Sequence, residues 1–155
     1  MGQQPKTQIN PTGTLTVLSV SPIQEDHSTL ESIMGYARWT VLRADKLPAV
    51  PPILRNHRDI SVVLCERDLI SGTWIDILTH IQPMLNPPSL IVTSRLADDR
   101  LWAEALNLGA WDVLAKPFDR CEVLRSVRSA WQHWNRLVEL IAKPARVMTA
   151  ARAAS

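Results

Sequence analysis

Ser61-Val62-Val63-Leu64-Cys65 is a run whose central residues are apolar at consecutive positions, so the strand it predicts is buried on both faces. A strand covered on both faces is typical of a parallel sheet with helices packed on each side. Outward from this run, other short apolar segments predict strands at residues 16–20, 39–43, 90–93 and 113–115. Apolar residues at helical spacing predict helices at residues 23–34, 47–55, 74–84 and 98–108, and a long last helix after Asp119.

The regular alternation of strands and helices predicts the fold class. Right-handed crossovers leave few ways to wind such a chain. We therefore expect an α/β fold, a three-layer α/β/α sandwich around a five-stranded parallel sheet in the flavodoxin-like doubly wound order. Gly109 is expected to close the fourth helix, and Asp119 with Glu122 to cap the start of the last one. Pro144 is expected to end that helix near Ala142.

Length and composition predict one domain. The 155 residues, 46% of them hydrophobic, can bury one core and are too few for two ordinary domains. We expect a polar, flexible arm at residues 1–13, the domain at 14–135, and an extension of the last helix with a tail at 136–155. The net charge of +2 predicts no general attraction to nucleic acid or to a membrane. No stretch reaches the about 18 apolar residues of a membrane span, so we expect a soluble cytoplasmic protein with reduced cysteines.

The predicted strand ends bring a small set of polar side chains together. In an open parallel sheet, reactive groups collect beyond the carboxyl ends of the strands. The carboxylate of Glu66, the hydroxyl of Thr93 and the ammonium of Lys116 are expected to converge there. The loop after the first strand, which begins Ser21-Pro22, lacks the glycine-rich or Ser/Thr-rich pattern that a nucleotide or flavin binder needs.

The second half of the chain carries a specific resemblance. Ala105-Leu106-Asn107-Leu108-Gly109-Ala110, followed by Asp112-Val113-Leu114-Ala115-Lys116-Pro117-Phe118, resembles the closing signature of response-regulator receiver domains. Ile91-Val92-Thr93-Ser94-Arg95 resembles that family's fourth strand, and Val62-Val63-Leu64-Cys65-Glu66 resembles its third. The resemblance implies a non-enzymatic module of two-component (phosphorelay) signalling that binds partner proteins.

Carried over by position, the resemblance assigns three site residues and exposes two departures. Glu66 occupies the place of the phospho-acceptor, Thr93 that of the switch hydroxyl, and Lys116 that of the site lysine. Ser21-Pro22 replaces the acidic pair that holds magnesium, and Val113 replaces the aromatic switch residue. A hard cation prefers carboxylate oxygens, so we expect that the magnesium site is lost, that no cofactor is bound, and that conventional aspartyl phosphorylation does not occur.

Several readings of the acidic residues stay open. Glu66 either imitates the phosphorylated state by pairing with Lys116 or forms a structural ion pair with it. The alternative function is a working phospho-acceptor that uses Glu66 or Asp68. Glu25 and Asp26 are expected only to favour the helix N-terminus through the helix dipole. The four histidines have no metal-ligand spacing and are expected at exposed or half-buried positions.

The last helix predicts self-association. Its apolar residues alternate at spacings of three and four, the period of a helix–helix seam, and they are Leu124, Val127, Trp131, Trp134, Val138 and Ile141. The seam is longer than a sheet of this size needs. We therefore expect a homodimer through the last two helices, with the interface residues Trp102, Trp131, Trp134, Val138 and Ile141. The basic residues of this helix form no nucleic-acid recognition motif, so no nucleic-acid partner is expected.

Overall fold

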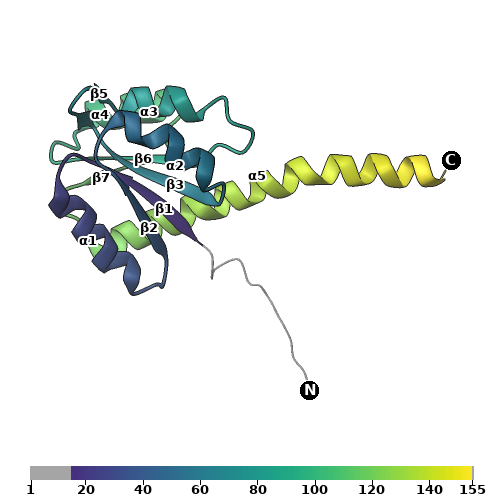
Figure 1. The fold of residues 1–155 in the computed structure, drawn as a ribbon, viewed down its shortest axis with the longest axis horizontal. Coiled ribbons are helices and arrows are strands. Elements are labelled where there is room, and N and C mark those ends of the chain that lie inside the picture. Colours follow the sequence, from purple (N-terminus) through teal and green to yellow (C-terminus); the bar gives the residue numbers. More distant parts are fainter. Residues whose placement is uncertain (1–14, 155) are drawn as a thin grey trace, which may run out of the picture.

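The computed structural model describes residues 15–154, and the side chains up to residue 142. The predicted arm at residues 1–13 lies outside the described residues. Five strands form one parallel sheet in the order β2-β1-β3-β6-β7 (Figure 1). Their bounds are β1 Thr16–Val20, β2 Thr40–Ala44, β3 Ile60–Glu66, β6 Ser89–Ser94 and β7 Asp112–Ala115. This confirms the predicted doubly wound, flavodoxin-like fold.

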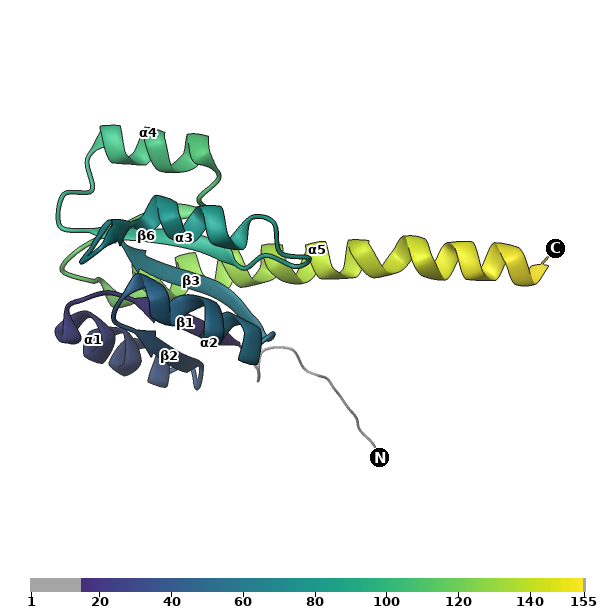
Figure 2. The ribbon, with the colours of Figure 1, turned by 45° about the horizontal axis from the view of Figure 1, so that its top comes forward.

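The helices cover both faces of the sheet (Figure 2). Their bounds are α1 Gln24–Gly35, α2 Val50–Asn56 after a short 3-10 helix at Leu47–Ala49, α3 Trp74–Ile81, α4 Asp99–Leu108 and α5 Arg120–Ala154. Helices α1 and α5 pack on one face, and α2, α3 and α4 pack on the other. Although α5 is 35 residues long, no helix within residues 15–154 combines the length and apolar character needed to cross a membrane.

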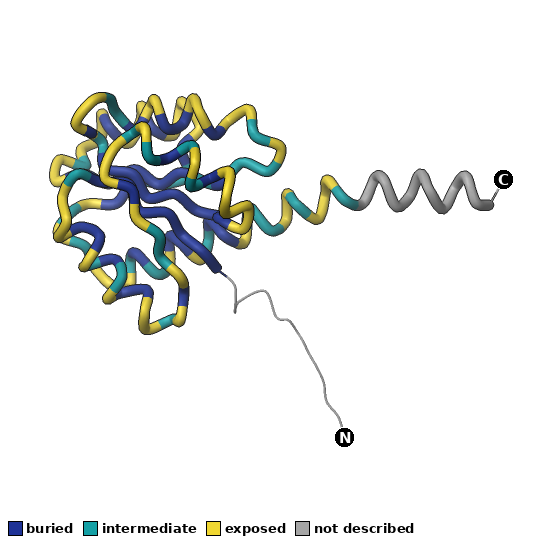
Figure 3. Tube along the Cα trace, in the orientation of Figure 1, coloured by how far each residue is buried: buried dark blue, intermediate teal, exposed yellow. Residues whose placement is uncertain are grey.

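The surroundings of β3 explain why its apolar residues are consecutive in the sequence. Successive side chains of a strand point to opposite faces. Val63 and Cys65 therefore join the core under α2 and α3, while Val62 and Leu64 join the core under α1 and α5. Every residue of β3 is buried, and the dark strands at the centre of Figure 3 show the same for the neighbouring strands. The prediction of a central strand buried on both faces is confirmed.

Two predicted helix ends are also confirmed. Gly109 closes α4 with φ of 110°, a left-handed conformation that costs glycine little because it has no Cβ. At the start of α5, the Asp119 carboxylate accepts a hydrogen bond from the Glu122 backbone N–H at 2.9 Å, as an N-cap residue does.

The structure corrects the predicted end of α5 and adds a hairpin. The helix does not end near Ala142 but continues past Pro144 to Ala154. A proline removes one backbone donor, but the alanine-rich segment that follows favours helix strongly enough to continue it. A small antiparallel hairpin, β4 Asp68–Leu69 with β5 Gly72–Thr73, follows β3. Strands of two residues are too short to show a period, so the sequence pattern did not predict them.

Candidate functional site at the strand ends

The carboxyl ends of β3, β6 and β7 lie side by side at one edge of the sheet. Glu66 at the end of β3 lies beside Thr93 of β6, and Ser94 lies beside Ala115 of β7. Lys116 follows β7 directly, and its backbone N–H donates to the Ser94 carbonyl at 3.0 Å. This register brings the predicted site residues to the same edge.

Lys116 is the centre of the site. Its side chain is only 6% exposed, and its ammonium forms an ion pair with Oε1 of Glu66. The same Nζ donates to Oδ2 of Asp26 at 2.8 Å. The predicted pairing of Glu66 with Lys116 is therefore confirmed, and one ammonium is shared by two nearly buried carboxylates.

Asp26 is the site residue that the sequence prediction missed. We expected it to act only on the helix dipole, but its side chain is buried and accepts hydrogen bonds from Lys116 and from Oγ of Ser21 at 2.7 Å. Asp26 is the third residue of α1, and the cap residue Ile23 has no polar side chain to hold the first turn. Ser21 Oγ also accepts from the Ile23 backbone N–H at 3.1 Å, so the loop folds back and brings the carboxylate to the strand ends.

Thr93 and Asp68 do not join the ion pair cluster, which consists of Lys116, Asp26 and Glu66. Thr93 is buried, and its backbone carbonyl accepts from the Arg67 N–H at 2.9 Å. Among residues 15–142, no hydrogen bond joins the Thr93 hydroxyl to Glu66. Asp68 is exposed in β4 and pairs with the neighbouring Arg67 guanidinium at 3.0 Å. The structure therefore places Glu66, and not Asp68, against Lys116.

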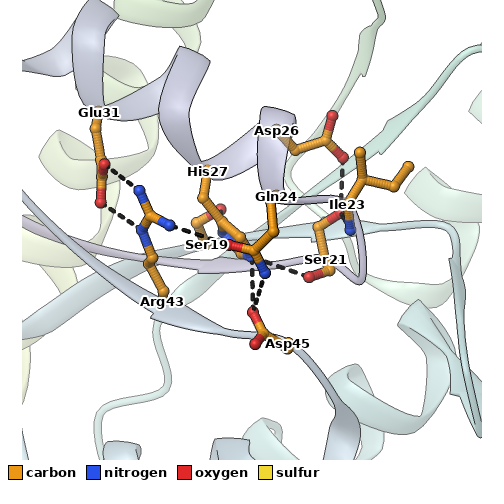
Figure 4. A network of polar contacts seen from close by, with 9 residues as sticks. All are labelled: Ser19, Ser21, Ile23, Gln24, Asp26, His27, Glu31, Arg43 and Asp45. Carbon is orange, nitrogen blue, oxygen red and sulfur yellow. Dashed lines mark hydrogen bonds and ion pairs between the residues drawn. The ribbon is translucent and has the colours of Figure 1, made fainter.

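His27 corrects a second prediction, because it is fully buried and not at the surface. Its Nδ1 lies 2.8 Å from Oγ of Ser19, and its Nε2 lies 2.9 Å from the Ser21 carbonyl and 3.2 Å from Oδ1 of Asp45 (Figure 4). A buried imidazole needs such partners, since an unsatisfied polar group in the core costs free energy. These contacts hold the first turn of α1 against β1, and so hold the adjacent Asp26 in the site.

The two strand-end carboxylates are already paired with a cation. Magnesium binds oxygen ligands, usually carboxylates and water. Here the Lys116 ammonium already lies between the carboxylates of Asp26 and Glu66 and occupies one oxygen of each. No group of three or more His, Cys, Asp or Glu side chains able to hold a metal occurs among the described residues.

The predicted interface residues divide into two groups. Trp131 is buried in the core with α1, because it continues the inward stripe of Val123, Val127 and Ala130, so it is not an exposed member of the predicted helix seam. Trp134 is half-buried, and its indole Nε1 donates to the Asn86 carbonyl at 3.3 Å. The remaining members, Trp102, Val138 and Ile141, are exposed or half-buried.

Comparison with known proteins identifies the fold. No protein-family model and no curated protein matches the chain. A signal receiver domain of a putative LuxO repressor from Vibrio parahaemolyticus has a TM-score of 0.74 at 16% identity, over 83% of this chain and 98% of that one.

A response regulator receiver domain from Clostridium thermocellum has a TM-score of 0.72 at 18% identity, over 79% of this chain and 98% of that one. A chain of the CheX–CheY–BeF3–Mg complex from Borrelia burgdorferi has a TM-score of 0.69 at 24% identity, over 76% of this chain and 89% of that one. These likenesses show that the chain has the receiver fold.

Proposed function

We propose that the chain is a receiver-like signalling module of two-component type, which works in the cytoplasm by binding partner proteins and is not conventionally phosphorylated. The receiver fold and the resemblance of residues 105–118 support the signalling role. One observation carries the rest of the proposal: the Lys116 ammonium lies between the buried carboxylates of Asp26 and Glu66.

This arrangement is unsuited to phosphoryl transfer for two physical reasons. Transfer to a carboxylate requires an attacking oxygen in line with the phosphorus, and cations on the phosphoryl oxygens. Oε1 of Glu66 is held by Lys116, and the charge of that lysine is already shared between two carboxylates. Ser21-Pro22 supplies no carboxylate for a metal. We therefore interpret the Glu66–Lys116 pair as a structural ion pair that holds the strand ends in one state.

The test is phosphorylation by a small donor. We expect that acetyl phosphate with magnesium leaves the intact mass of the protein unchanged, whereas a phosphorylatable receiver domain treated in parallel gains a phosphoryl group. Beryllofluoride with magnesium, an acyl-phosphate analogue, should likewise produce no binding heat.

The alternative is a phospho-acceptor at Glu66 or Asp68, and it predicts the opposite result. If acetyl phosphate phosphorylates the wild type, and Glu66→Gln or Asp68→Asn is not phosphorylated, the proposal is overturned and the substituted residue is the acceptor.

We further propose a homodimer built on α4 and α5. Helix α5 leaves the domain and projects well beyond it (Figure 1). On the projecting part, Leu137, Leu140 and Ile141 are 39%, 58% and 51% exposed. Each large apolar side chain left in water forfeits about 1.5–3 kcal/mol of burial. A second copy of the same helix covers them, with the 41% exposed Trp102 of α4 at the flank.

Light scattering tests this dimer. We expect a dimer for the wild type and a monomer for the double variant Val138→Asp/Ile141→Asp, because each aspartate would bury a charge in the helix seam. Ile70→Asp is the matched control, since Ile70 is 77% exposed in the β4–β5 turn, which follows the carboxyl end of β3. A wild-type monomer, or a dimer that the double variant leaves intact, would exclude this interface.

A further inference from the structure

Helix α1 closes with an arginine in a position that normally takes glycine. Arg38 has φ of 60°, in the left-handed region. The Trp39 N–H donates to the Met34 carbonyl and the Arg38 N–H to the Gly35 carbonyl, both at 3.1 Å, which is the hydrogen-bond pattern of a Schellman motif. A residue with a Cβ is strained in this conformation. Helix closure alone therefore favours glycine, and the arginine at this position is not explained by the helix end.

A cavity lies beside Arg38, between the α1–β2 turn and the middle of α5. It has a volume of about 570 Å³. Its apolar lining is Leu15, Ala37, Trp39 and Trp131, and its polar lining is Arg38, Arg128 and Gln132. A neighbouring depression of about 420 Å³ shares Arg128 and Gln132 and adds Arg125. We call the two together the α1–α5 pocket. Because Leu15 and Trp39 each directly precede a strand, the larger cavity lies toward the opposite edge of the sheet from Lys116, and the neighbouring depression extends along α5 back to Cys121.

The charge of the α1–α5 pocket is uncompensated. Within residues 15–142, none of the guanidinium groups of Arg38, Arg125 and Arg128 forms an ion pair with a carboxylate. No aspartate or glutamate lines either part of the pocket. Arg128 instead lies over the Trp39 ring, 5.4 Å from its centroid. Positive charge around an apolar floor is complementary to a ligand that carries carboxylates beside an apolar group.

We infer that the α1–α5 pocket binds an acidic segment of a partner protein, which inserts an apolar side chain over Trp39 and Trp131 and places carboxylates against the arginines. This inference rests on the proposed protein-binding function and names the chemistry of the partner. Arginine pairs with carboxylate through two parallel hydrogen bonds, and aromatic floors are frequent anchor sites in interfaces. A cavity of this size suits one or two apolar side chains.

A peptide fits these observations better than nucleic acid does. Nucleic-acid surfaces track a phosphate backbone with a line of basic residues and offer exposed aromatic faces for base stacking. Here the arginines surround one hollow, and the rings of Trp39 and Trp131 are only 9% and 8% exposed. The pocket therefore accepts a side chain and not a stacked base.

The test uses the full-length protein labelled with nitrogen-15 and a short synthetic peptide with a central Leu-Phe pair flanked by glutamates. We expect saturable shifts of the indole signals of Trp39 and Trp131, with those of Trp74 and Trp102 unchanged, and weaker binding at high salt. A peptide with lysines in place of the glutamates should not bind. The variant Arg125→Gln/Arg128→Gln should weaken binding at least about tenfold, because charged interface contacts are lost.

Two further variants separate binding from folding. Arg55→Gln/Arg58→Gln removes the same charge on the α2 side and should leave the affinity unchanged. Arg38→Gly relieves the left-handed strain, so it should unfold at the same or a higher urea concentration than the wild type and still bind more weakly.

The inference is overturned if the peptide does not bind, if it shifts other signals, if Arg38→Gly binds as tightly as the wild type, or if duplex DNA displaces the peptide from the same signals. A protein that is phosphorylated by acetyl phosphate but binds the peptide would refute only the proposed absence of phosphorylation. A protein that is not phosphorylated and does not bind the peptide would refute only the inferred binding at the α1–α5 pocket.

Discussion

Replacing Lys116 with methionine removes the cation that joins Asp26 to Glu66. The side chains of these three residues are 6%, 10% and 11% exposed, so the variant leaves two nearly buried carboxylates facing each other without a counter-charge. Breaking a buried ion pair costs about 3–5 kcal/mol, and the residual solvent contact here favours the lower end, about 3 kcal/mol. For a chain of this size that corresponds to a fall of about 10 °C in the melting temperature.

Urea unfolding followed by tryptophan fluorescence measures this loss at one fixed protein concentration, because self-association makes stability concentration-dependent. Lys46→Met is the matched control, since Lys46 is exposed, and it should change the free energy of unfolding by less than about 0.5 kcal/mol. Adding Asp26→Asn and Glu66→Gln to Lys116→Met should restore most of the stability, because no buried charge then lacks a partner. If Lys116→Met unfolds at the wild-type midpoint with an unchanged urea dependence, the ion pair cluster does not stabilise the fold.

Three other expected outcomes follow from the described contacts. Trp74→Ala should cost about 3–5 kcal/mol in the same unfolding assay, because this fully buried ring would leave a cavity in the core under α3; a loss below about 1 kcal/mol would contradict that packing. Gly109→Ala should cost about 1–2 kcal/mol through its positive φ, and an unchanged midpoint would argue against the left-handed helix end. Burial raises the pKa of the Cys65 thiol, so a thiol reagent should label only the exposed Cys121 in the native protein and both cysteines in urea.

The sequence was sufficient for the fold because the strand pattern and the rules of winding left little choice. The consecutive apolar residues of β3 require cover on both faces, and right-handed crossovers then leave few possible strand orders. Gly109 and Asp119 marked helix ends through local chemistry alone. The β4–β5 hairpin and the passage of α5 through Pro144 depend on contacts and propensities that a periodic pattern does not record.

The site was only half predictable, for a related reason. Glu66 and Lys116 close neighbouring parts of one sheet edge, so the register of parallel strands brings them together. Asp26 reaches the same edge only because Ser21 folds the loop back and His27 holds the first turn of α1 against β1. Those contacts join residues two, five and six positions apart, each through at least one side chain, and neither helical nor strand spacing indicates them.

Helix α5 also has a mechanical consequence. It is one continuous helix whose first part is packed in the core, while its second part projects from the domain. The about 20 residues beyond Trp134 rise about 30 Å, so a tilt of about 5° at the domain displaces the far end by about 2.6 Å. The helix therefore has the geometry of a lever arm, in which a small rotation at the domain becomes a larger displacement at the far end.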